Sequence, residues 1–158
     1  RTGTATFDAA KILKKAGANI ELVETLVQEP YEMVKKRTEI IASAMRFEDN
    51  ILMSVMREGE YPRSIASQAS DTLIQTKDIE AAFVLCYTAK DEVMISARSK
   101  GDMNVQLIME KMNGGGHKTA AGLQRKDSDI DSLKKELETV LRDYLSERKK
   151  ENEGNNVE

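Results

Sequence analysis

"IEAAFVLCYTAKDEVMISARSK", residues 79–100, contains two apolar runs that are separated by a short polar segment. Both runs are rich in residues that favour extended strands, so the stretch predicts a β-hairpin. Further strand-like runs occupy residues 50–58 and 117–126, and helical patterns occupy residues 64–75, 104–112 and 128–149. This order of elements predicts an α+β fold, close to α/β, with a mixed β-sheet flanked by helices.

The helix at residues 104–112 is predicted from the spacing of its apolar side chains. Val105, Ile108, Met109 and Met112 recur at positions i, i+3, i+4 and i+7, which places them on one helical face. Asn104 immediately precedes this run and is a suitable N-cap residue. The helix therefore ends where a run of glycines begins.

The chain upstream of residue 50 is predicted to be helical. Thr6 is the expected N-cap of a first helix that stops at Gly17, and Asn19 is expected to cap a second helix. A longer amphipathic helix is predicted to begin at Pro30 and to continue to about residue 49. Its stripe consists of four residues at helical spacing: Val34, Thr38, Ile41 and Met45.

The composition limits the classes of ligand and the compartment. With a formal net charge of -3, the chain has no global positive field that would attract a long nucleic acid, so an anionic ligand must be met locally. A single cysteine, Cys86, indicates a reducing compartment, and we interpret it as a buried apolar residue, not as a nucleophile. Because no apolar stretch approaches the ~20 residues that span a bilayer, we expect a soluble, cytoplasmic segment.

Residues 112–122, MNGGGHKTAAG, contain three consecutive glycines followed by the only histidine. A helix that ends at Met112 needs one left-handed residue to stop, and Asn113 or Gly114 would suffice. The remaining glycines suggest a close approach of the backbone to a ligand, with successive N–H groups forming a nest for phosphate oxygens and His117 as a further donor. The alternative is that the glycines form only a flexible cap and turn.

Ser96 and Arg98 are two residues apart on a predicted strand and therefore share one face of it. The planar guanidinium of Arg98 could bind a phosphate, with the Ser96 hydroxyl as a second donor. Taken alone, Arg98 could equally be a solvated surface charge. No cluster of histidines and aspartates accompanies these residues, so we expect recognition groups and neither a metal site nor catalytic residues in this segment.

The segment NGGGHKTAAG, with SARSKGDMNVQLIMEKM before it, resembles the substrate-binding DHHA1 domain of the DHH phosphoesterase superfamily. The hallmark of that domain is GGGH followed by small residues. The opening RTGTATFDAAKILKKAGA is similar to the last segment of the partner DHH domain in membrane-bound cyclic di-AMP phosphodiesterases of the GdpP or YybT type. The resemblance extends to about residue 145.

The resemblance implies a function and a division of the chain. Members of this type hydrolyse cyclic di-AMP to pApA with two Mn²⁺ ions held in the DHH domain. Residues 1–28 would then be the C-terminal remnant of a DHH domain, 29–47 a connecting helix, 48–150 the DHHA1 domain and 151–158 a disordered tail. Because the chain starts after the DHH motif, we expect a fragment that is inactive alone, from a protein anchored in the membrane with this domain on its cytoplasmic side.

The same resemblance assigns roles to six residues. These residues would bind a phosphate and the nucleoside of the substrate. When the resemblance is combined with the chemistry of the residues, His117 and Arg98 would also stabilise charge on nonbridging oxygens in the transition state. The residues concerned are Ser96, Arg98, Gly114, Gly115, Gly116 and His117.

Two other functions remain open at this point. One is an oligonucleotide phosphodiesterase of the nanoRNase or RecJ type, with a short oligonucleotide as substrate. The other is a noncatalytic module for dimerisation or regulatory interaction, in which the glycine loop is only a turn. The expected partners are therefore a cyclic dinucleotide or short oligonucleotide, the DHH domain of the same chain, and a second copy in a homodimer.

Overall fold

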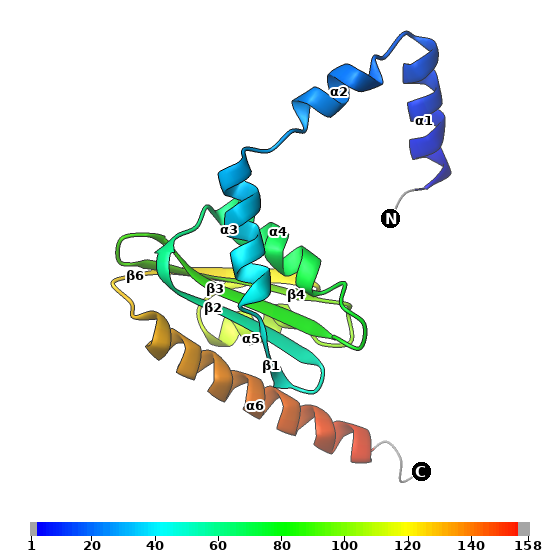
Figure 1. Ribbon diagram of the computed structural model, residues 1–158. Coiled ribbons are helices and arrows are strands. Elements are labelled where there is room, and N and C mark those ends of the chain that lie inside the picture. The colour runs from blue at the N-terminus through cyan, green and yellow to red at the C-terminus, as the bar shows by residue number, and fades with distance from the viewer. Residues whose placement is uncertain (1–2, 155–158) are drawn as a thin grey trace. The chain divides into compact units, whose positions relative to one another are not determined.

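A computed structural model describes residues 3–154, with side chains up to Lys150. It divides into two compact units, one ending at Tyr31 and one beginning at Glu32. Within the described residues the second unit is built on a six-stranded sheet in the order β1-β2-β3-β4-β6-β5 (Figure 1). The strands are β1 (Met45–Glu48), β2 (Ile51–Glu60), β3 (Ala81–Ala89), β4 (Glu92–Ser99), β5 (Gly115–His117) and β6 (Ala120–Lys126).

The sheet is mixed, as predicted. Strands β2 and β3 are parallel and are connected through helix α4 (Arg63–Leu73), whereas the other neighbouring strands are antiparallel. The predicted hairpin at residues 79–100 is β3–β4, closed by the pair Ala89–Glu92 around Lys90 and Asp91. Asp91 adopts a φ of 60°, a left-handed conformation that aspartate tolerates better than most residues.

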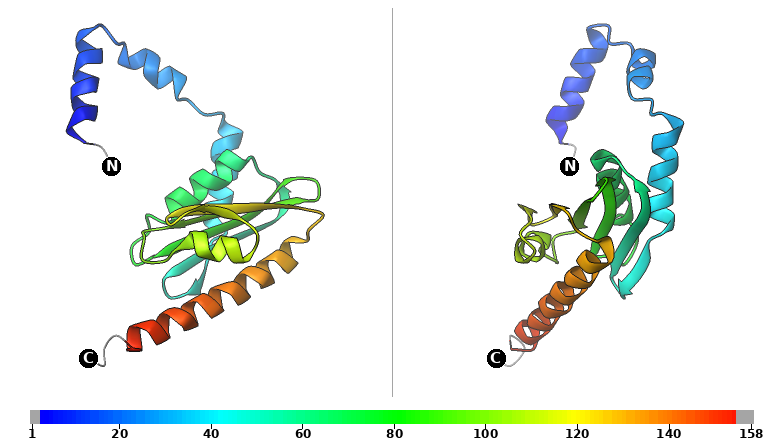
Figure 2. Two further views of the ribbon diagram at one scale, coloured as in Figure 1. Left: turned by 180° about the vertical axis from the view of Figure 1, so that it is seen from behind. Right: turned by 90° about the vertical axis from the view of Figure 1, so that its left-hand side faces the viewer.

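Helices cover both faces of the sheet, so the fold is α+β (Figures 1 and 2). On one face, α5 (Val105–Lys111) and α6 (Ile130–Gly154) pack on a core that includes Phe83, Leu85 and Ile95. On the other face, α3 (Tyr31–Ala42) and α4 pack on a core that includes Val84 and Cys86. Strand β3 supplies both cores because its alternate side chains point to opposite faces.

The burial of Cys86 confirms its interpretation as a buried apolar residue. Its side chain is 0% exposed, and this burial raises the pKa of its thiol to about 12. The unfolded chain releases this proton above about pH 8.5, so the folded state binds more protons between there and about pH 12, and stability falls as pH rises. We expect the free energy of unfolding to drop by about 2 kcal/mol more in the wild type than in Cys86→Ala between about pH 8 and about pH 10.

Urea unfolding of both proteins at each pH measures this difference. The Cys86→Ala variant is the control because other groups that titrate in the same range are present in both chains. Equal losses of stability in the two proteins would contradict the prediction.

The ends of two helices differ from the predictions. Helix α3 ends at Ala42, and the following residues form β1, because Met45 pairs with Met53 of β2. Met45 is 74% exposed, so its helical spacing from Ile41 did not reflect a shared apolar face. Helix α6 continues to Gly154, into the segment predicted to be a disordered tail, and residues 155–158 lie outside the described part.

The N-terminal unit contains α1 (Thr4–Lys15) and α2 (Ile20–Leu26). Gly3, not Thr6, is the N-cap of α1, because the helix begins before the predicted position. Gly17 has a φ of 93°, as expected at a helix stop, and the side chain of Asn19 caps α2 as predicted. Several large apolar side chains of this unit are more than half exposed, namely Phe7, Ile12, Leu13, Ile20, Leu22, Val23, Leu26 and Val27.

No helix between residues 3 and 154 combines the length and the apolar character that crossing a bilayer requires.

Candidate functional site

The glycine run begins at the C-terminus of α5. Asn104 caps the start of this helix as predicted, and Asn113, with a φ of 62°, supplies the left-handed residue after its end. The amide of Gly114 donates a hydrogen bond to the Met109 carbonyl over 2.7 Å. This amide is therefore occupied by the helix cap and does not point to an open site.

Gly115–His117 form the edge strand β5, paired antiparallel with β6. The prediction of a concave nest is thus wrong, because these residues continue the sheet instead of turning around a point. An edge strand still leaves alternate N–H groups without a strand partner, and these can donate to a ligand. Lys118 and Thr119 then turn the chain into β6, so the strand predicted at residues 117–126 begins only at Ala120.

Gly114 and Gly116 are required because the backbone of β6 passes close to them. A Cβ atom on Gly114 would lie 2.6 Å from the carbonyl oxygen of Gly122, and one on Gly116 would lie 2.5 Å from that of Ala120. Gly116 also has a φ of +147°, which side chains rarely adopt. The close approach inferred from the sequence is therefore an approach to β6. Gly115 is different, since a Cβ there would meet nothing within 4 Å.

The strand register places the predicted site residues on one face of the sheet. Directly paired residues share a face, and Ser96 pairs with Gly122, which pairs with Gly115. In the next row, Arg98 pairs with Ala120, which pairs with His117.

This face is the one on which α4 packs against β3 and β4. Beyond α4 it presents only small side chains between Arg98 and the exposed His117. We call this area the β4–β6–β5 face and define it by Ser96, Arg98, Gly115, His117, Ala120 and Gly122.

Arg98 is held in place by several partners and is not the solvated charge considered above. Its Nε donates to Oδ1 of Asp71 on α4 over 2.6 Å. Its Nη1 donates to the Ala97 carbonyl over 3.1 Å and to Ser96 Oγ over 3.3 Å. The side chain is 20% exposed, compared with 55% for Asp71, so the guanidinium is sheltered while the carboxylate is solvated.

A hollow of about 390 Å³ lies on this face, between α4 and strands β4 and β6. Ser96 and Arg98 in this hollow were predicted from the sequence. The residues that α4 contributes were not, because they lie far away along the chain. Arg63 at one end of the hollow forms an ion pair with Glu92 over 3.2 Å. The remaining polar side chains that line it are Ser67 and Gln124.

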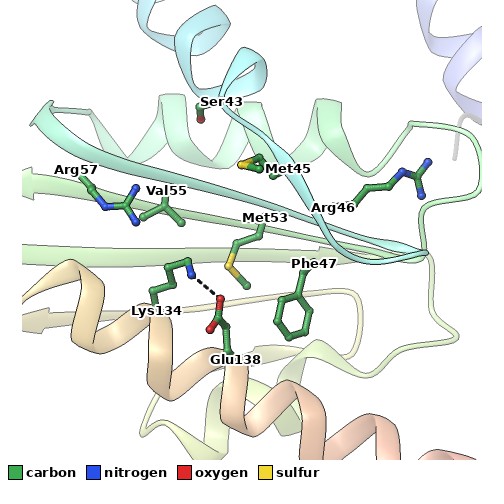
Figure 3. Close-up of a pocket in the computed structure, with 9 residues that line it drawn as sticks. All are labelled: Ser43, Met45, Arg46, Phe47, Met53, Val55, Arg57, Lys134 and Glu138. Atoms are coloured by element: carbon green, nitrogen blue, oxygen red, sulfur yellow. Dashed lines mark hydrogen bonds and ion pairs between the residues drawn. The ribbon is translucent and has the colours of Figure 1, made fainter.

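A second hollow, of about 310 Å³, lies at the opposite edge of the sheet between β1, β2 and α6 (Figure 3). Its floor includes Met53 and Val55, and Phe47 lines one side. Two of its cations are neutralised within the chain, because Arg57 pairs with Asp131 over 2.8 Å and Lys134 with Glu138 over 2.5 Å. It contains none of the six residues that are predicted from the sequence to bind substrate.

The described residues do not provide a metal centre. Between residues 3 and 154, no three histidine, cysteine, aspartate or glutamate side chains lie together in a way that could hold an ion. The donor set of these described residues therefore does not fit a pair of Mn²⁺ ions.

Solved structures with the same fold are distant in sequence. An exopolyphosphatase-related protein from Bacteroides fragilis matches with a TM-score of 0.76 at 16% identity, over 90% of this chain and 44% of that one. A pGpG-specific phosphodiesterase, PggH, from Vibrio cholerae matches with a TM-score of 0.50 at 18% identity, over 88% of this chain and 51% of that one. At such identities the likeness concerns the fold alone.

Curated relatives are closer in sequence. The cyclic-di-AMP phosphodiesterase GdpP of Bacillus subtilis is 35% identical over 148 residues, and the cyclic-di-AMP phosphodiesterase PdeA of Listeria monocytogenes is 37% identical over 145 residues. These alignments cover 92% and 91% of this chain but only 22% of each relative. The model of the DHHA1 domain matches residues 48–143. The chain therefore belongs to the DHHA1 domain family.

Proposed function

We propose that this chain is the substrate-binding part of a phosphodiesterase that hydrolyses cyclic di-AMP to pApA. The observation that carries the proposal is the β4–β6–β5 face, on which the strand register gathers Ser96, Arg98, Gly115 and His117. The similarity to GdpP and PdeA over more than nine tenths of the chain supports cyclic di-AMP as the substrate.

The chemistry of this face suits one nucleotide of such a substrate. A phosphate over Ala120 and Gly122 would lie between the Arg98 guanidinium and the His117 imidazole, both of which can donate hydrogen bonds to it. The adjoining hollow, with Ser67 and Gln124, offers polar partners for the attached nucleoside.

The role of this domain in the reaction is positional. It holds the dinucleotide so that the scissile phosphorus faces the catalytic groups of a preceding DHH domain, where we place the two Mn²⁺ ions. The exposed apolar side chains of α1 and α2 support the assignment of residues 1–28 to that domain, because an amphipathic helix is stable when its apolar face is covered. The longer protein would provide the cover, the activity and any membrane anchor.

Titration of the 158-residue chain with cyclic di-AMP, followed by amide chemical shifts, tests the proposal. We expect the largest shifts at Gly115, Gly116 and His117 and on β4 near Arg98, because these groups line the face. The amide of Gly114 should shift less, since it already donates to Met109. Residues around Arg57 serve as an internal control, because they line the hollow at the other edge of the sheet.

Two outcomes would count against the proposal. Silence of the β4–β6–β5 face at millimolar cyclic di-AMP would favour the noncatalytic interaction module. Stronger binding of short RNA than of cyclic di-AMP, under the same conditions, would favour an oligonucleotide phosphodiesterase.

A further inference from the structure

The guanidinium of Arg98 is hydrogen-bonded to α4. Asp71 lies in the last turn of α4, and its carboxylate accepts a hydrogen bond from Nε of Arg98 over 2.6 Å. Because Nε is the nitrogen nearest the aliphatic stem, a bond at this atom fixes the direction in which the rest of the planar guanidinium points. Asp71 therefore occupies Nε of Arg98 and leaves the terminal nitrogen Nη2 to a ligand.

A second connection joins Arg98 to α4 through two buried hydroxyl groups. Ser96 Oγ accepts from Nη1 of Arg98 and lies 2.8 Å from Ser70 Oγ, which in turn donates to the Ser67 carbonyl over 2.8 Å. Ser70 is 0% and Ser96 2% exposed, so water does not compete for these bonds. The network is continuous from the backbone of α4 to the guanidinium.

One nitrogen of the guanidinium remains for a ligand. Among the residues that the structure describes, none accepts a hydrogen bond from Nη2 of Arg98, whereas Nε and Nη1 are both engaged. We infer that Asp71 is a positioning residue, which orients Arg98 so that Nη2 donates to a phosphate oxygen of the bound dinucleotide. This inference rests on the proposed function.

The negative charge of Asp71 also opposes phosphate binding, and the experiment must separate this electrostatic effect from the orienting effect. A carboxylate beside Arg98 lowers the net positive charge that a phosphate meets, so removal of the charge alone would strengthen binding. The carboxylate is half exposed and its field is screened by water, whereas the hydrogen bond to Nε is short. The orienting effect is therefore expected to exceed the electrostatic one.

A double-mutant cycle on the 158-residue chain, with the Kd for cyclic di-AMP as the measurement, tests the inference. We expect Arg98→Ala to weaken binding about 10-fold and Asp71→Ala about 5-fold. In the Arg98→Ala background, Asp71→Ala should change the Kd less than about 2-fold, because its effect passes through Arg98. Asp71→Asn keeps an acceptor for Nε and should remain within about 2-fold of the wild type.

Asp131→Ala is the matched control. Asp131 also pairs with an arginine, Arg57, over 2.8 Å, but at the hollow on the opposite edge of the sheet. It should leave the Kd for cyclic di-AMP unchanged. A weakening equal to that of Asp71→Ala would mean that the loss of any surface ion pair has the same effect, and would overturn the inference.

The remaining outcomes separate this inference from the proposed function. If Arg98→Ala weakens binding but Asp71→Ala does not, or if Asp71→Ala and Asp71→Asn both tighten it, Asp71 is not a positioning residue and the proposed function stands. If wild-type chain does not bind cyclic di-AMP, or Arg98→Ala leaves its Kd unchanged, the proposed use of the β4–β6–β5 face fails, and the inference fails with it.

Discussion

Replacement of Gly116 by alanine is expected to destabilise the folded chain by about 4 kcal/mol, with contributions from backbone strain and from overpacking. Its φ of +147° is unfavourable for any residue with a side chain, and the new methyl group would lie 2.5 Å from the Ala120 carbonyl oxygen. It would also lie 2.4 Å from the Cα atom of Ala121, and neither atom can move easily, because both belong to the backbone of β6. A loss of this size is a large share of the ~5–15 kcal/mol that stabilises an ordinary domain.

Gly115→Ala is the matched control for this prediction. A Cβ at Gly115 meets no atom within 4 Å, and its φ lies outside the range that excludes side chains. Its stability should therefore change by less than about 1 kcal/mol. Urea unfolding of both variants measures the difference. Equal stabilities would show that β6 does not constrain the glycine run in the way described.

Replacement of His117 by alanine is expected to lower turnover of cyclic di-AMP by about 100-fold in the longer protein to which we assign this domain. The imidazole is exposed and lies in the same row of the sheet as Arg98, with Ala120 between them. In that place it can donate a hydrogen bond to a phosphate oxygen as negative charge accumulates in the transition state. Steady-state kinetics of wild type and variant measure the effect.

Two further variants sharpen the test of His117. His117→Gln keeps an N–H donor and should recover part of the lost turnover, whereas a purely steric role would not distinguish donors from other side chains of similar size. Leu107→Ala alters an exposed side chain on α5 and should leave turnover unchanged. Wild-type turnover in His117→Ala would remove this residue from the mechanism.

Much of the fold could be predicted because the informative residues are close together in the sequence. The β3–β4 hairpin follows from two apolar runs around a short polar turn, and α5 follows from four apolar residues at helical spacing. The edge strands could not be predicted in the same way. Strand β5 has three residues, and two of them are glycines, which are depleted in strands. Strand β1 contains Met45, whose spacing also fits a helix.

The site was predicted less completely than the fold. The residues Ser96, Arg98 and His117 were identified, but their common face depends on the register of β6 between β4 and β5, which no local pattern specifies. The partnership of Arg98 with Asp71 spans 27 residues and depends on how α4 packs. The glycine run was interpreted as a ligand nest because the sequence alone does not reveal that β6 passes within van der Waals distance of it.

The connection between β3 and β4 has a consequence for the order of folding. These strands are joined by a tight turn, so they can pair after the closure of a very short loop, whereas β2 reaches its parallel partner β3 only across α4. Loop-closure entropy makes the hairpin an early event and the parallel pairing a later one. The half of the sheet that carries Ser96 and Arg98 is therefore expected to form within the folding nucleus, before β2 pairs with β3.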